Sequence, residues 1–293
     1  MVFAIGLAHN ANPSNSVGYY AMSTITSSQP ASKLKQLPLL RLAFRPFFLL
    51  AALFSILSLL VWLGFWHGNI LLRPYGGLVF WHQHEMLFGF AAAVIGGFLL
   101  TAVRNWTGLP SLSGGPLLGL VVLWLLGRVL MAFPMDLPGW LLLAVDLAFL
   151  PVVAIVMARL VITAKRWRNL IFIPVLLLFA TANLAMHLGV MQGDAELIRQ
   201  AAYLAVLLIT LMMTVVGGRV IAMFTANRLG RTKPEPIALL EGVTLVSTAG
   251  VVVLQLVIML GVAIPALLMG GVMLLAALAN TVRMARWGGL HSW

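Results

Sequence analysis

The hydrophobic positions of the chain fall into long runs separated by short polar breaks. Each run is close to the roughly 20 residues that an α-helix needs to cross the hydrocarbon core of a bilayer. Eight such runs cover residues 43–66, 79–102, 116–133, 139–163, 170–190, 198–224, 237–260 and 264–282. The pattern therefore predicts an all-α fold, a polytopic bundle of about eight transmembrane helices.

The boundary between the last two runs is the least marked, because the apolar residues hardly pause from residue 237 to residue 282. A single helix of that length would overrun the bilayer. Pro265 closes the segment that begins at Gly261, and proline is well suited to the first turn of a helix. We therefore expect one helix to end near Gly261 and another to begin near Pro265.

Composition supports the membrane prediction and excludes other classes of protein. Hydrophobic residues make up 62% of the chain, charged residues make up 9%, and the mean hydropathy is +1.05, which is typical of polytopic membrane proteins. The net charge of +11 does not indicate nucleic acid, because the basic residues lie in the breaks between apolar runs. The absence of cysteine excludes disulfides and thiolate metal ligands.

The basic residues also predict the orientation of the helices. When the breaks are numbered alternately, 14 Lys and Arg residues fall on one side of the membrane, and only Arg73 and Arg199 fall on the other. The side rich in basic residues is normally cytoplasmic. We therefore expect both termini in the cytoplasm, with a disordered tail at residues 1–36, the helical bundle at residues 37–287 and a short tail at residues 288–293.

Four of the six histidines are predicted to lie at the external ends of helices: His67, His82, His84 and His187. Imidazoles at one depth form a candidate metal layer. The alternative is that they are interfacial anchors or hydrogen-bond donors between helices, which are common roles for histidine in membranes. We favour that alternative for His67, which stands at the water interface.

The run from residue 80 to residue 99 contains the densest group of candidate ligands. On a regular helix, His82, Glu85 and Met86 share a face that is otherwise small, with glycine and alanine at every fourth position. Such a face allows close helix packing, so His82 and Glu85 are predicted to point into the bundle. His84 lies on the opposite face, among phenylalanines.

A straight helix cannot bring His82 and His84 to one metal ion, because their directions differ by about 200°. Either the helix begins at His84, or the two histidines serve two centres, with copper at His82 and haem at His84. Imidazole suits haem iron and copper, and the thioether of Met86 is a soft ligand for Cu(I). Glu85 could orient a ligating imidazole or carry a proton.

Further polar residues lie inside predicted helices. Arg128 and Asp146 occur in adjacent helices and are expected to pair, in preference to a role in proton transfer. Asn183, one turn before His187, could hydrogen-bond that histidine. Arg219 lies near the inner surface and is expected to extend toward it. No catalytic residue is predicted, because nothing resembles a P-loop, a dinucleotide fingerprint or a serine-hydrolase elbow.

Three motifs resemble those of a known family. RLAFRPFFL from Arg41, WHQHEMLFGFAAAVIGGFLLTAVRNWTG from Trp81 and GGRVIAMFTANRLG from Gly217, in that order, are similar to the NnrS family over residues 38–287. That family comprises haem- and copper-containing proteins of the bacterial inner membrane, linked to nitric oxide, nitrosative stress and denitrification. The resemblance implies a helical bundle that binds both cofactors, with His82 and His84 as the natural ligand candidates.

The resemblance also carries an expectation about length and two hypotheses about function. Family members resemble twelve-helix proteins, so we expect this chain to lack their C-terminal helices. The first hypothesis is a haem/copper protein that binds or responds to nitric oxide. The alternative is a transporter or maturation factor for metal, haem or a small solute, with Glu85, Asp146 and Arg219 in an internal path. We prefer the first, because the polar residues concentrate near the external side.

The predicted orientation is tested by reporter fusions. A reporter that is active only in the cytoplasm should give signal when fused after Lys233 and no signal when fused after Asp194, since the basic asymmetry places these breaks on opposite sides. The reverse pattern, or signal at both positions, would show that the helix count is wrong.

Overall fold

A computed structural model describes residue 34, residues 37–68 and residues 72–288. The described elements are η1 (Pro38–Leu40), α2 (Phe44–Trp66), α3 (Leu78–His84), η2 (Glu85–Ala91), α4 (Ala92–Thr107), α5 (Gly115–Ala132), α6 (Gly139–Leu147), α7 (Phe149–Thr163), η3 (Trp167–Asn169), α8 (Phe172–Gln192), α9 (Ala195–Arg228), α10 (Ala238–Met259) and α11 (Ala266–Ala285). Of these, η1 and η3 are 3₁₀-helices, and η2 is a π-helix. The described residues contain no strand.

All eight predicted membrane spans are confirmed. Eight helical stretches of the described residues are long and apolar enough to cross a membrane, and each coincides with one predicted run. The break near Gly261 is also confirmed, because α10 ends at Met259 and α11 begins after Pro265. The predicted tails lie outside the described residues, apart from Leu34 and Gly288.

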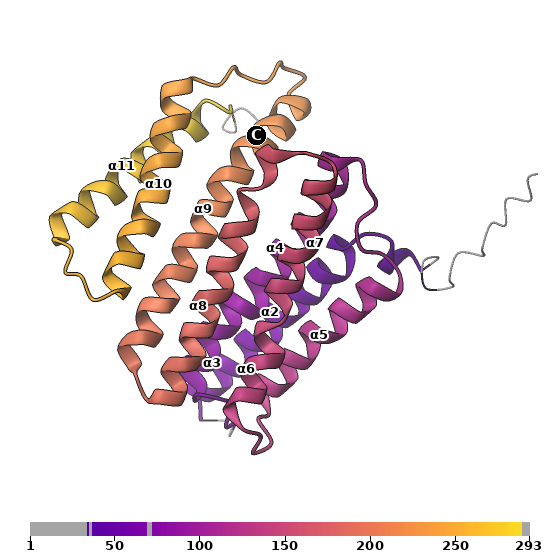
Figure 1. Cartoon of the computed structure of the whole chain (residues 1–293), viewed down its shortest axis with the longest axis vertical. Helices are drawn as coiled ribbons and strands as arrows, with labels where there is room; N and C mark the ends of the chain where they lie inside the picture. The colour runs from indigo at the N-terminus through magenta and orange to yellow at the C-terminus, as the bar shows by residue number, and fades with distance from the viewer. Residues whose placement is uncertain (1–33, 35–36, 69–71, 289–293) are drawn as a thin grey trace, which may run out of the picture. The chain divides into compact units, whose positions relative to one another are not determined.

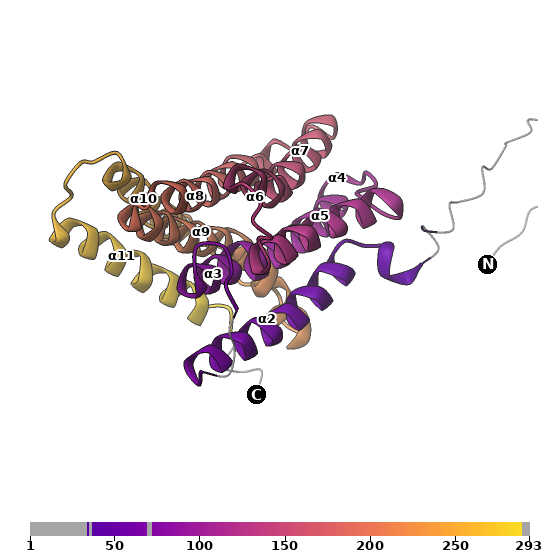
Figure 2. The ribbon, with the colours of Figure 1, turned by 90° about the horizontal axis from the view of Figure 1, so that it is seen from below.

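The helices of residues 32–293 pack around two neighbours, α8 and α9, which lie side by side (Figure 1). Helices α4 and α7 pack together on one side of this pair, and α2 packs against α4. On the other side, α10 packs against α9, and α11 packs against α10 (Figure 2). Helices α2 and α11 are the least buried spans. Their exposed leucines and methionines suit contact with lipid.

Local sequence explains where several helices end. Gly108 and Gly193 follow α4 and α8 with φ of 73° and 70°, the left-handed conformation that glycine adopts most readily at helix ends. Asp194 then caps α9 by accepting a hydrogen bond from the amide of Leu197 at 2.9 Å. The fourth span is interrupted at Ala148, because Pro151 has no N–H to donate to the carbonyl three to four residues before it.

The second span runs through the interior and is packed on both faces. It comprises α3, η2 and α4, and half of its most apolar window is buried. On one face, Gly97 lies against Phe47 of α2. On the other face, Phe88 packs against Phe179 of α8, with ring centroids 4.8 Å apart. The prediction of a close-packed small face is thus correct, and the bulky face is buried as well.

Burial of both faces alters the expected positions of the two histidines. Glu85 is fully buried, as predicted, but His84 on the bulky face is fully buried too. His82 is half-buried and stacks on Trp62 of α2, with ring centroids 4.2 Å apart. His82 thus faces another helix of the bundle, α2, but it is only partly buried, whereas Glu85 is fully buried. Because the second span has neighbours on both faces, the bulky face that carries His84 is interior as well.

Close packing of α2 on α4 gives a stability prediction. A β-carbon added at Gly97 would stand 2.8 Å from the β-carbon of Phe47, so Gly97→Ala should destabilise the protein by about 1–3 kcal/mol through overpacking. Gly119→Ala in α5 is the matched control, because nothing lies within 4 Å of its added β-carbon. Thermal unfolding in detergent should show a lower midpoint for Gly97→Ala alone. Equal midpoints would contradict the described contact.

Candidate metal centre

Six polar residues meet inside the bundle and form one buried cluster. They come from four separate spans, and His84, Glu85 and His187 have no exposed surface at all. The members of the buried cluster are His84 at the end of α3, Glu85 at the start of η2, Arg128 of α5, Asp146 of α6, and Asn183 and His187 of α8.

Arg128 connects the two carboxylates of the buried cluster. Its Nη1 donates to Oε2 of Glu85 at 2.6 Å, and its Nη2 donates to Oδ1 of Asp146. The expected pairing of Arg128 with Asp146 is thereby confirmed, and Glu85 is a second partner that the sequence did not indicate. A buried guanidinium with a carboxylate on each terminal nitrogen fixes the positions of both acids.

The local backbone makes room for this ion pair. A β-carbon at Gly89 would lie 2.5 Å from Oε2 of Glu85 and 2.7 Å from Nη1 of Arg128, so only glycine leaves space there. Gly89 lies in the π-helix η2, and its carbonyl accepts a hydrogen bond from Nε1 of Trp124 at 3.0 Å. Single-turn π-helices are often found at functional sites.

His84 is surrounded by oxygen atoms. Its Nδ1 lies 3.3 Å from Oε1 of Glu85, and its Nε2 lies 2.8 Å from Oδ1 of Asn183 and 3.2 Å from Oδ2 of Asp146. Asn183 in turn donates from Nδ2 to Oδ2 of Asp146 at 2.7 Å. Asn183 thus bonds His84 and Asp146, whereas the sequence suggested His187 as its partner.

His187 approaches the same carboxylate from the other side and keeps one nitrogen free. Its Nε2 lies 3.2 Å from Oδ2 of Asp146, and its Nδ1 is buried with no hydrogen-bond partner among the described residues. The rings of His84 and Tyr75 lie 5.2 and 5.4 Å from the ring of His187. Burial raises the pKa of Tyr75, so this phenol stays neutral beside the histidine.

Three of these side chains form a candidate metal triad: His84, Asp146 and His187. Each offers one ligand atom, and these atoms all lie within 4.8 Å of one another. Two imidazoles and a carboxylate suit a first-row transition metal. The Nε2 atoms of His84 and His187 each lie 3.2 Å from the same oxygen, Oδ2 of Asp146, so the three side chains converge on one position.

The charge of the buried cluster also favours a cation. Glu85 and Asp146 contribute two negative charges and Arg128 contributes one positive charge, so the cluster carries a net charge of −1 when both imidazoles are neutral. An uncompensated charge inside a membrane protein is costly. One additional positive charge, from a monovalent metal ion or a proton on His84, would neutralise the cluster.

The remaining candidate residues lie apart from the triad. His82 faces Trp62, and its Nδ1 has no partner among the described residues. Met86 is half-buried on the same span, and neither residue belongs to the triad. His67 is exposed at the end of α2, as the interfacial alternative predicts. Of the four histidines in the predicted layer, the fold brings only His84 and His187 together.

Sequence reasoning missed the role of Asp146 as the acid shared by both histidines. The signal was present, because Arg128 lies near the end of the third span and Asp146 near the start of the fourth. These positions set both residues at the external level already predicted for His84 and His187. The depth of Asp146 in the bundle therefore indicated that it lies near the two histidines, whereas residue spacing within a single helix did not.

Comparison with known protein families agrees with the motif resemblance. A family model described as NnrS protein matches residues 38–293 of the chain. Neither the curated proteins nor the solved structures gave a match. The matched region includes every member of the buried cluster, so the cluster lies wholly within the part of the chain that defines the family.

The central role of Arg128 gives a second stability prediction. Arg128→Met leaves Glu85 and Asp146 buried without their cation, so unfolding should become easier by about 3–5 kcal/mol. Adding Glu85→Gln and Asp146→Asn to Arg128→Met should recover much of this loss, because no unpaired charge remains buried.

The matched control is Arg199→Met, which breaks a wholly exposed pair with Glu196 and should change stability little. Chemical unfolding in detergent gives the comparison. If Arg128→Met were no worse than Arg199→Met, the described ion pairs would not be present in the folded protein.

Proposed function

Because the chain belongs to the NnrS family, we propose that this multi-pass membrane protein holds copper at the metal triad and acts in the bacterial inner-membrane response to nitric oxide. The observation that carries the proposal is the triad itself, three buried side chains whose ligand atoms all lie within 4.8 Å of one another. When bound, copper supplies one-electron chemistry and a position for a small diatomic ligand.

Copper fits the triad in charge and in ligand type. Cu(I) is a monovalent ion, so it would bring the net charge of the buried cluster from −1 to zero. Imidazole is a good ligand for copper, and the hydrogen bonds of Asn183 and Arg128 would hold Asp146 in one orientation. Divalent ions would leave an excess positive charge in an apolar interior, which is less favourable.

A porphyrin does not fit the triad as it is packed. The two ring nitrogens of His84 already face side-chain oxygens, Nδ1 at 3.3 Å from Glu85 and Nε2 at 2.8 Å from Asn183, so neither nitrogen opens onto space for a porphyrin. Neither His84 nor His187 lines any of five prominent cavities among the described residues. The sequence-based assignment of haem to His84 therefore receives no support from the packing.

His82 is the candidate that remains for haem in this chain. Its ring is half-buried at the outer end of the second span, and its Nδ1 is without a partner among the described residues. It faces α2, whose other face is largely exposed. The two-centre hypothesis is retained with the roles exchanged, so that copper belongs to His84 and His187 and haem belongs to His82.

The surroundings of the triad favour a small apolar ligand. His84 and His187 have no exposed surface, and aromatic rings pack on His84. Nitric oxide is small and uncharged, so it can dissolve in such an interior, whereas an anion such as nitrite would have to lose its hydration. The transporter alternative receives less support, because the triad has no contact with Arg219, which instead bonds Asn169.

Copper and haem content per folded protein tests the assignment. His187→Ala should reduce copper to background and retain any haem, whereas His82→Ala should retain copper and reduce haem. His67→Ala, which removes an exposed imidazole, is the control and should lose neither. Elemental analysis and the haem absorption band of the monodisperse fraction give the readout. Full copper in folded His187→Ala protein would contradict the triad.

The physiological part is tested in cells that lack their own family member. Cells expressing the chain should grow better under a nitric oxide donor than cells expressing His187→Ala at equal membrane abundance. Equal growth of the two strains would contradict the proposed response while leaving the metal result untouched.

A further inference from the structure

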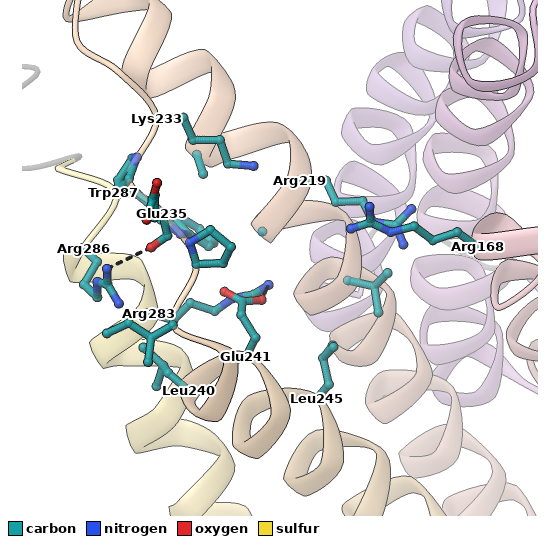
Figure 3. Close-up of a pocket in the computed structure, with 16 residues that line it drawn as sticks. Arg168, Arg219, Lys233, Glu235, Leu240, Glu241, Leu245, Arg283, Arg286 and Trp287 are labelled. Carbon is teal, nitrogen blue, oxygen red and sulfur yellow. Dashed lines mark hydrogen bonds and ion pairs between the residues drawn. The ribbon is translucent and has the colours of Figure 1, made fainter.

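A second polar site lies at the opposite end of the bundle, where the basic residues gather. It is a cavity of about 260 Å³ between α9, the connection from α9 to α10, and the ends of α10 and α11. Figure 3 shows basic side chains entering it from several elements. The charged residues in its lining are Arg168, Arg219, Lys233, Glu235, Glu241, Arg283 and Arg286.

The cavity has a surplus of positive charge. One pair is neutralised internally, because Arg283 donates to the two carboxylate oxygens of Glu241 at 2.9 and 2.5 Å. Four further cations face a single remaining carboxylate, that of Glu235, so the lining carries a net charge of +3. Arg286 donates a hydrogen bond to the backbone carbonyl of Glu235. Because this carbonyl is neutral, the positive charge of Arg286 stays uncompensated.

Two arginines face each other without an acid between them. Arg219 is half-buried, and its Nη1 donates to the neutral side-chain oxygen of Asn169 at 2.8 Å. Figure 3 shows the guanidinium of Arg168 beside it, and the two repel each other. Neither Arg168 nor Lys233 has a hydrogen bond or ion pair among the described residues. A fold that holds like charges together in this way is suited to an anion.

An apolar cavity adjoins the basic one. It has a volume of about 430 Å³, lies between α9 and α11 and is lined mainly by aliphatic and methionine side chains. Trp287 lines both cavities, and tryptophan is a common residue at the membrane interface. A basic site next to an apolar groove at the end of membrane helices matches the two parts of an anionic phospholipid.

We propose that the basic cavity binds the phosphate of an anionic membrane phospholipid, with Arg168, Arg219 and Lys233 around the phosphate and an acyl chain in the groove between α9 and α11. The apolar groove favours a lipid over a soluble phosphate ester, which would leave the groove without an occupant. The site lies on the side that the basic residues predict to be cytoplasmic, where anionic headgroups attract basic clusters.

Binding is measured by titrating the purified full chain with phosphatidylglycerol and following the bound state by native mass spectrometry. Phosphatidylglycerol should bind at least tenfold more tightly than phosphatidylcholine of the same chains. Arg168→Gln with Lys233→Gln should weaken the binding of phosphatidylglycerol about 25-fold, because each basic residue near an anionic lipid contributes about a fivefold factor. The control is Arg228→Gln with Arg231→Gln, which removes the same charge from exposed positions outside the cavity.

The lipid source is separated from a soluble source by two further arms. Glycerophosphoglycerol, the deacylated headgroup of phosphatidylglycerol, carries the same single phosphodiester charge without acyl chains and should bind far more weakly than phosphatidylglycerol. Ala277→Trp, which fills the groove from an exposed position, should weaken the binding of phosphatidylglycerol and leave the binding of glycerophosphoglycerol unchanged. The proposal is overturned if the two ligands bind equally, if the two lipids bind equally, or if both double variants behave alike.

Discussion

The buried guanidinium of Arg128, paired with Glu85 and Asp146, is the group on which the end of the bundle that contains the buried cluster depends. It holds Glu85 and Asp146 in place from two different helices, and Asp146 then orients His84, Asn183 and His187. These polar contacts link four spans within an otherwise largely apolar interior, together with the hydrogen bond from Trp124 to the carbonyl of Gly89. The metal triad follows from that arrangement rather than from any local motif.

The spans themselves could be predicted from sequence because crossing a bilayer imposes a length and an apolar composition on every helix. Even the unmarked boundary near Gly261 could be located, since proline and helix length gave independent constraints there. Pairing of Arg128 with Asp146 was also predictable, because buried charges in a membrane require partners. In each case the physical constraint acts within one segment or between two consecutive segments.

The position of the histidines could not be predicted in the same way. A helical wheel distinguishes two faces, but it does not tell whether both faces have neighbours. The second span has neighbours on both faces, so His84, on the face with the phenylalanines, is the fully buried ligand candidate. His82 lies against Trp62 of α2. The contacts of Asp146 with both histidines depend on how the second, fourth and fifth spans pack together, and no spacing in the sequence encodes that packing.

The proposed binding of copper by His84, Asp146 and His187, in the space organised by Arg128, is tested most directly by X-ray absorption at the copper edge of the purified, copper-loaded chain. We predict Cu(I) with nitrogen and oxygen neighbours only, including the outer-shell scattering of two imidazole rings. A sulfur neighbour would contradict the account, because it would place copper with Met86, on the side of His82, and outside the triad.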